Sequence, residues 1–155
     1  MVKTLLASLG ILLFASGCIS TGPGAGQGRR EPATTGSITL SGPTFGDVTL
    51  APGSCRSGEH EVFLGADFSS PGSDLVVRLV VDPLEAPGVR IFDRNDRSGK
   101  TLVLRKADCA GFEVSLGRKG WQLNDVYVLE AHIQLDCSLP GGDRVEGRVA
   151  TESCW

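Results

Sequence analysis

From Ser37 onward the chain consists of short apolar runs separated by turn-forming residues, and this pattern constrains the fold more than any other feature. No long stretch shows the periodicity of an amphipathic helix. Apolar residues alternate with polar ones across 127–135, which places Glu130, His132 and Gln134 on one face of a strand. Strands are predicted at 37–41, 47–50, 59–68, 74–82, 88–93, 101–106, 111–116, 126–136 and 144–152. The sequence therefore predicts an all-β fold, either an antiparallel β-sandwich or a small β-barrel of about eight or nine short strands.

The composition fits one folded domain with many turns. The chain has 155 residues, of which 41% are hydrophobic, with 21 glycines and 8 prolines. Dipeptides such as Pro52-Gly53 and Pro71-Gly72 are typical of turns. The formal net charge is −3, and the part after Ser37 is more acidic still. This balance excludes the basic footprint of a nucleic-acid-binding protein, so no nucleic-acid partner is expected.

The first eighteen residues have the order of an export signal. Lys3 precedes an apolar run at 5–15, and the small residues Ala15, Ser16 and Gly17 stand directly before Cys18. The run has about 11 residues, which is too short to span a bilayer but suits the apolar region of a secretory signal.

These residues resemble the bacterial lipoprotein signal, the lipobox. The resemblance implies that a signal peptide, 1–17, is cleaved and that the Cys18 thiol receives a diacylglycerol, often with a further acyl chain such as palmitate on the new amino terminus. Two or three acyl chains hold a protein stably on a membrane. Ile19, where retained lipoproteins have Asp, favours the outer membrane if the host is diderm. An ordinary secretory signal with an incidental cysteine is the alternative.

The segment after the signal is rich in Gly, Pro, Ser and Thr and almost devoid of apolar residues. Such a composition does not bury enough surface to offset the entropy of ordering. Residues 18–36 are therefore predicted to be a lipidated cysteine followed by a flexible tether, and residues 37–155 to be the β domain.

Four cysteines remain in the β domain, and an even number in an exported protein predicts two disulfides. They are Cys55, Cys109, Cys137 and Cys154. Because no C-x-x-C pair occurs, a metal site is not expected. A hairpin centred on 138–143 would place Cys137 opposite Arg144 and Cys154 near Tyr127. We favour Cys55–Cys109 with Cys137–Cys154, and the other two pairings stay open.

The residues able to do chemistry are few. His60 and His132 both lie in predicted strands beside carboxylates, namely Glu59, Glu61 and Glu130. Neither an H-E-x-x-H nor a G-x-S-x-G motif is present. No catalytic residue, metal or cofactor is predicted, and residues 93–100 depart from the calcium-loop pattern and are expected to be a charged hairpin turn.

One connection stands out for binding. Residues 117–125 bring two cations, an aromatic ring and amide groups between two predicted strands, and loops of this composition are frequent in recognition surfaces. The candidate recognition residues are Arg118, Lys119, Trp121 and Asn124. Alternatively, Trp121 covers the end of the core as a lid.

The segment LNDVYVLEAHIQLDC, a Gly-rich turn and RVEGRVATESC resemble the C-terminal half of small bacterial lipoproteins with a disulfide-stapled β domain. The resemblance implies no particular activity. We expect a lipid-anchored protein of the cell envelope whose β domain is a non-enzymatic binding or structural module, with an envelope protein or a glycan as partner. The alternatives are an envelope hydrolase that uses a His–carboxylate pair and an inhibitor or receptor that presents the 117–125 loop.

Overall fold

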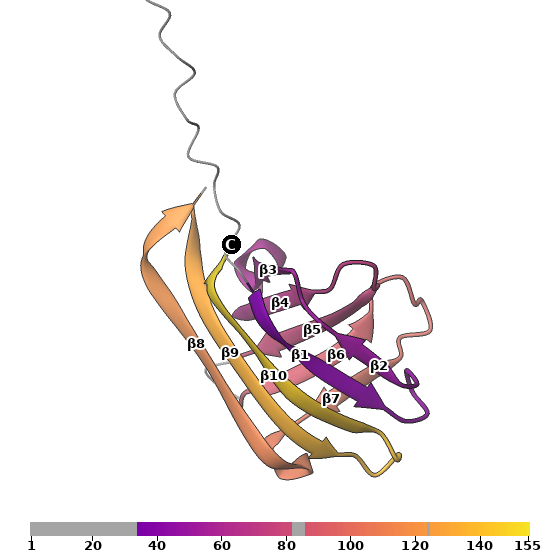
Figure 1. The fold of residues 1–155 in the computed structure, drawn as a ribbon. Helices are drawn as coiled ribbons and strands as arrows, with labels where there is room; N and C mark the ends of the chain where they lie inside the picture. Colours follow the sequence, from indigo (N-terminus) through magenta and orange to yellow (C-terminus); the bar gives the residue numbers. More distant parts are fainter. Residues whose placement is uncertain (1–33, 82–85, 124) are drawn as a thin grey trace, which may run out of the picture.

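The computed structural model describes residues 34–81, 86–123 and 125–155, which form two five-stranded antiparallel sheets (Figure 1). Sheet A has the strand order β2-β1-β10-β9-β8, and sheet B has the order β3-β4-β5-β6-β7. The predicted all-β fold is confirmed, in its sandwich form. Within the described ranges, no helix is long and apolar enough to cross a membrane.

Sheet A contains the longest strands. Its members are β1 (Thr34–Ser41), β2 (Val48–Leu50), β8 (Cys109–Leu123), β9 (Val126–Ser138) and β10 (Arg144–Cys154). Sheet B is built from β3 (Ser54–Ser57), β4 (Gly65–Ser69), β5 (Leu75–Val80), β6 (Gly88–Asp93) and β7 (Thr101–Leu104). Two short 3-10 helices, η1 (Gly58–Glu61) and η2 (Lys106–Asp108), follow β3 and β7.

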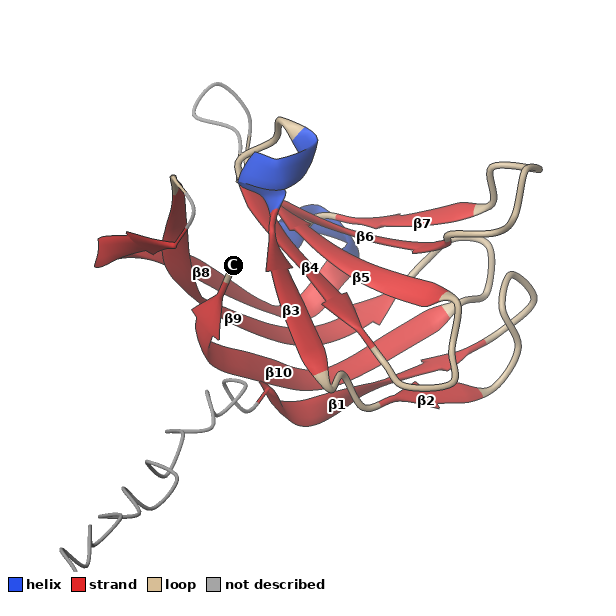
Figure 2. Cartoon of the chain, turned by 90° about the horizontal axis from the view of Figure 1, so that it is seen from above, coloured by secondary structure: helices blue, strands red, loops and turns tan. Residues whose placement is uncertain are grey.

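The core lies between the facing sides of the two sheets (Figure 2). The alternation predicted for 127–135 is confirmed from Leu129 onward, where Ile133 and Leu135 are buried and Gln134 points outward. It is wrong at the start of β9, because Tyr127 is 37% exposed and Val128 is buried. From sheet B, Val77 and Leu79 of β5 fill the same space. Each such side chain contributes roughly 1.5–3 kcal/mol on burial, so the alternating positions fix which face of each strand points inward.

The predicted strand 59–68 is wrong in its first half. Ser57 caps η1 by accepting a hydrogen bond from the amide of Glu59 (3.3 Å), and Val62 ends the turn with φ of 63°. Serine favours such local side-chain-to-backbone bonds, which compete with a strand ladder. The chain therefore turns at His60, and β4 begins only at Gly65.

The predicted boundary between tether and domain is also wrong. β1 begins at Thr34, and Thr34, Thr35 and Gly36 pair with Thr151, Ala150 and Val149 of β10. Backbone ladder bonds need no apolar side chain, which is why composition misses these residues. Gly36 has φ of 90°, and a Cβ there would lie 2.1 Å from the carbonyl oxygen of Arg148. The predictions for residues 1–33, including lipidation of Cys18, concern a part of the chain outside the described residues.

The predicted loop 117–125 is a strand hairpin. β8 continues to Leu123 and β9 starts at Val126, with Gln122 opposite Tyr127 and Leu123 opposite Val126. A register shift between Arg118 and Gln122 adds residues to β8. Glycines and charges at 117–120 indicated a loop, but a two-stranded ribbon is held by its own backbone bonds. Asn124 lies outside the described residues.

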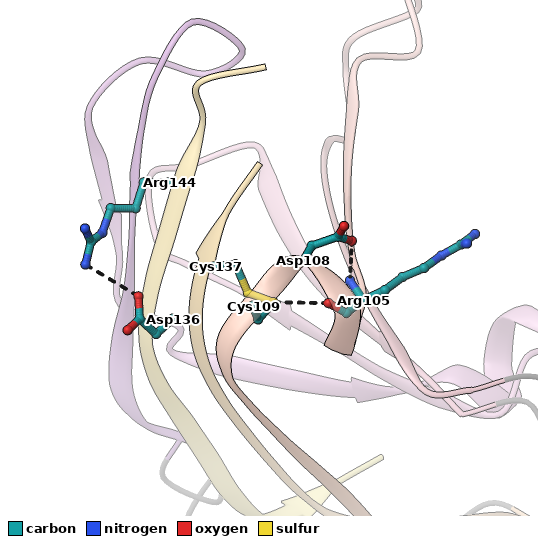
Figure 3. Close-up of a disulfide and its surroundings, with 6 residues drawn as sticks. All are labelled: Arg105, Asp108, Cys109, Asp136, Cys137 and Arg144. Carbon is teal, nitrogen blue, oxygen red and sulfur yellow. Dashed lines mark hydrogen bonds and ion pairs between the residues drawn. A yellow bond between two sulfur atoms is a disulfide. The ribbon is translucent and has the colours of Figure 1, made fainter. Parts of the chain in front are cut away.

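All four cysteines of the domain are in disulfides, as predicted, but the favoured pairing is wrong. The bonds are Cys55–Cys154 and Cys109–Cys137. Cys137 lies opposite Val145 rather than Arg144, and a bulge after Thr151 brings Cys154 opposite Leu129. Cys109 lies directly opposite Cys137 on the neighbouring strand, which the sequence cannot show without the register (Figure 3).

The two disulfides connect different parts of the fold. Cys109–Cys137 joins adjacent strands within sheet A, just after η2, where the Asp108 carboxylate accepts a hydrogen bond from the Arg105 amide (3.2 Å) (Figure 3). Cys55–Cys154 connects edge strand β3 of sheet B to the end of β10 in sheet A.

Candidate functional site

A row of small and polar side chains crosses the outer face of sheet A. Thr35 of β1, Ala150 of β10, His132 of β9 and Ser115 of β8 lie directly opposite one another on four neighbouring strands. Their neighbours in sequence, such as Ile133 and Val149, point into the core. The row is therefore an outward-facing feature of the sheet.

The sheet is hollowed beside this row. Both neighbours of β9 carry a register shift at nearly the same level: β8 between Arg118 and Gln122, and β10 between Thr151 and Cys154. Bulges bend a strand and increase its twist. Figure 2 shows the end of the β8–β9 hairpin bending away from sheet B.

The result is a hollow of about 880 Å³ on this face. Its polar lining consists of Thr35, Ser115, Glu130, His132, Glu152 and Ser153. Its floor contains small residues, among them Gly117, Ala131 and Ala150.

The rim of the hollow carries one ion pair. Lys119 Nζ lies 2.8 Å from the carboxylate of Glu130. This hydrogen bond is the main cause that raises the pKa of Lys119 above its ordinary value. Burial opposes it, and the charges of Glu130 and Glu152 add to the rise. Lys119, predicted as a recognition residue, is thus a partner of the acidic rim.

The polar side chains at the centre of the hollow make fewer contacts within the protein than those at the rim. Within the described ranges, no side-chain hydrogen bond or ion pair of the structure involves Ser115 or His132. The imidazole offers a donor and an acceptor in its neutral form, and the hydroxyl offers both as well. His132, Ser115 and Glu130 are on one face, but no hydrogen bond joins them into a nucleophile–base pair. The arrangement is suited to holding a polar molecule.

The second histidine does not belong to this site. His60 lies exposed in η1, not in a strand as predicted, and it does not line the hollow. His60 and its neighbouring carboxylates therefore lie outside the hollow that contains His132. In the described part of the chain, no three His, Cys, Asp or Glu side chains are grouped to hold a metal ion.

The hairpin tip, comprising residues 117–123 and 126–130, extends beyond the sandwich (Figure 1). Glu59 of η1 ties it to sheet B, accepting hydrogen bonds from Arg118 Nη2 (2.9 Å) and the Tyr127 amide (3.1 Å). The Arg118 guanidinium lies 4.8 Å from the centre of the Tyr127 ring. Arg118, also predicted for recognition, is therefore engaged within the molecule.

Trp121 behaves differently from the two cations. Its side chain is 52% exposed, so the interpretation of Trp121 as a lid on the core is wrong. Of the predicted recognition residues that the structure describes, Trp121 presents the largest apolar surface to solvent.

The outer face of sheet B has a polar cluster that the sequence analysis missed. Arg78 of β5 donates two hydrogen bonds of 2.7 Å to Asp67 of β4 and one to Glu61. The guanidinium carbon lies 4.2 Å from the centre of the Phe63 ring and 5.1 Å from that of Phe92. The bond to Asp67 is the main cause that raises the pKa of Arg78, against the effect of burial. An arginine inside the apolar run LVVRLV was the available signal.

Residues 93–100 form the turn between β6 and β7, which confirms the predicted charged hairpin turn. Asp93 accepts a hydrogen bond from the Asn95 amide (2.8 Å), and Asp96 accepts one from the Ser98 amide (2.6 Å). The Ser98 hydroxyl and amide lower the pKa of Asp96. These carboxylates are used to build the turn.

Comparison with protein-family models, with curated proteins and with solved structures finds no match.

Proposed function

We propose that the protein is a lipid-anchored lipoprotein of the cell envelope whose β domain is a non-enzymatic binding module, with the hollow on sheet A as its binding surface. The observation that carries the proposal is the hollow itself. It has a volume of about 880 Å³, its lining contains polar and apolar residues, and it lies on a sheet that contains a disulfide. Binding sites are typically concave, with a few converging polar groups on a rigid scaffold.

The lining favours a ligand rich in hydroxyl groups, such as an envelope glycan. Ser115 and His132 supply neutral donors and acceptors, and Glu130 and Glu152 supply strong acceptors. The small residue Ala150, in the middle of the row, adds little bulk to the lining. Two carboxylates at the rim disfavour a strongly anionic ligand because like charges repel.

Binding is tested on the purified mature protein with an array of defined bacterial envelope oligosaccharides, followed by calorimetry on any that bind. His132→Ala and Ser115→Ala are expected to weaken binding by up to roughly tenfold each, since one hydrogen bond contributes about 0.5–1.5 kcal/mol. Gln134→Ala is the matched control, because Gln134 is exposed on the same face of β9 but does not line the hollow. Equal loss with Gln134→Ala contradicts the assignment of the hollow.

The anchor is supported by the order of Lys3, the apolar run and the small residues before Cys18. In cells, Cys18→Ala should release the domain from the membrane fraction, and mass spectrometry of the wild-type N-terminal peptide should detect the acyl chains. A mature wild-type protein without acyl chains contradicts the anchor and leaves the binding module to be judged by the array.

The alternative is an envelope hydrolase, and the placement of His132 opposite Ser115, with Glu130 nearby, is the observation that favours it. Incubating the same oligosaccharides with the protein distinguishes the two. Release of products that Ser115→Ala abolishes would establish the hydrolase, whereas unchanged oligosaccharides recovered from the complex support the binding module.

A further inference from the structure

We infer that the hairpin tip docks onto the surface of the membrane that holds the Cys18 anchor, through the exposed side chain of Trp121. The inference rests on the proposed lipid anchor. It is carried by two observations of the fold: where exposed apolar side chains gather, and where the chain from Cys18 joins the domain.

Three of the four exposed large hydrophobic side chains of the described residues belong to the hairpin tip or to the end of η1, whose Glu59 binds that tip. In residues 34–81, 86–123 and 125–155, the exposed large hydrophobic residues are Val62, Val103, Trp121 and Tyr127. Trp121 and Tyr127 are in the hairpin tip, and Val62 ends η1, which Glu59 ties to that tip. Val62 is 95% exposed and holds a left-handed φ of 63°, which is rare for a β-branched residue. Apolar groups gathered in this way indicate an interaction surface.

The chain from Cys18 arrives at the same end of the domain. β1 runs parallel to β9, because each is antiparallel to β10. Thr34, at the start of β1, lies opposite Thr151, which lies opposite Ala131 of β9. Residues 126–130 of β9 extend past this level by about 17 Å, at 3.4 Å per residue. The hairpin tip therefore projects in the direction from which β1 is reached.

The expected span of the segment after Cys18 and the projection of the hairpin tip are compatible with contact between the tip and the membrane. The sequence between Cys18 and Thr34 is Gly-rich, and the flexible tether that its composition predicts would have an r.m.s. span of roughly 22 Å. This span is similar to the projection of the hairpin tip, so an anchored domain would hold Trp121 at the membrane surface for much of the time. Tethering makes such contact intramolecular, so that even a weak surface is occupied.

The chemistry of the tip selects the interface between headgroups and acyl chains. Trp and Tyr are enriched at this depth because each has an apolar ring and a polar group. The nearby cations are already paired, Arg118 with Glu59 and Lys119 with Glu130. Docking should therefore depend on the aromatic side chain and not on anionic lipids.

The test uses the full-length acylated protein, purified from membranes and reconstituted into phosphatidylcholine vesicles that contain dibrominated acyl chains, which quench nearby tryptophan. Trp155→Phe leaves Trp121 as the reporter. The matched control is Ser138→Trp in a Trp121→Phe, Trp155→Phe background. Ser138 is exposed at the far end of β9, about 40 Å from Val126.

The Trp121 reporter should lose most of its emission in brominated vesicles, and the Ser138→Trp reporter should keep its own. Adding phosphatidylglycerol should leave both unchanged. Flotation and mass spectrometry on the same samples distinguish a failure of the docking from a failure of the lipid anchor. Acylated protein that floats with the vesicles without quenching of Trp121, or with quenching only when phosphatidylglycerol is present, overturns the docking alone. Protein that has no acyl chains and does not float overturns the anchor and the docking together.

Discussion

The outer faces of the two sheets both carry polar side chains, but they use them differently. On sheet B, Arg78 is bound by Asp67 and Glu61 and lies against the rings of Phe63 and Phe92. On sheet A, bulges on both sides of β9 hollow the surface, and His132 and Ser115 lie in that hollow. The Arg78 cluster on sheet B is satisfied within the molecule, whereas on sheet A Ser115 and His132 make no side-chain hydrogen bond or ion pair within the described residues. An outward-facing row of polar side chains therefore indicates a binding surface only where those side chains are not already hydrogen-bonded within the protein.

The largest expected effect comes from the disulfide that joins the two sheets. Replacing Cys55 and Cys154 by Ala should lower the free energy of unfolding by about 4–5 kcal/mol, because the bond closes a loop of about 100 residues. The Cys109→Ala, Cys137→Ala pair should cost about 3–4 kcal/mol, since its loop is shorter. Urea unfolding of the purified protein measures both. Equal losses, or a larger loss from the Cys109→Ala, Cys137→Ala pair, would contradict the view that the Cys55–Cys154 bond stabilises the fold more because it closes the longer loop.

A smaller loss is expected from opening the cluster on sheet B. Asp67→Ala leaves the Arg78 guanidinium without its main partner, in a place where its side chain is only 23% exposed. Removing one partner of a fully buried pair costs about 3–5 kcal/mol, and partial exposure reduces this to roughly 2–3 kcal/mol. Asp67→Ala combined with Arg78→Leu should recover part of the loss in the same urea experiment, because no unpaired charge remains. No recovery would mean that Asp67 supports the sheet by means other than this pair.

Substitutions in the hollow on sheet A should have little effect on stability, in contrast to Asp67→Ala on sheet B. His132→Ala and Ser115→Ala are expected to change the free energy of unfolding by no more than about 0.5 kcal/mol, because neither side chain makes a hydrogen bond or ion pair with another side chain in the described part of the chain. Thermal and urea unfolding without ligand provide the measurement, with Asp67→Ala as the reference on the other sheet. A loss as large as that of Asp67→Ala would assign these residues to structure and remove the contrast between the faces.

The smallest effect concerns the ion pair at the rim of the hollow. The folded-state pKa of Lys119 is raised above its ordinary value of 10.5. Its contribution to stability is therefore fully present below that pH and is lost as the pH rises through the folded-state pKa. Lys119→Gln should be slightly less stable than the wild type at neutral pH and low salt, and equal to it in strong alkali. High salt at neutral pH should also narrow the difference, because the pair is exposed. A gap that is the same at every pH contradicts the pairing with Glu130.

The sequence predicts the parts of this fold that depend on burial. Alternation places the inward side chains of β9 correctly from Leu129 to Leu135, since a strand with one buried face shows a period of two. The hairpin tip and the start of β1 are not predicted, because backbone ladder bonds hold them and leave no apolar pattern. η1 is missed for a similar reason: a cap by Ser57 decides it locally.

The site divides in the same way. His132 is recognisable from the sequence as an outward residue, but its neighbours Ser115 and Ala150 depend on the register of three strands. One bulge after Thr151 also moves Cys154 out of simple alternation and decides which cysteine it meets. Insertions of single residues leave little trace in composition, and they determine both the hollow and the disulfides.

The Cys55–Cys154 bond has a consequence for how the protein is made. A chain exported with its N-terminus first, as proposed above, would expose Cys55 and then Cys109 well before Cys154. The first two thiols to meet in an oxidising compartment are thus a pair that the finished structure does not contain. Thiol–disulfide exchange through a mixed disulfide can release such a bond. Under the proposed export, maturation of this domain is expected to depend on an isomerase as well as an oxidant, because Cys55 must be freed to pair with Cys154.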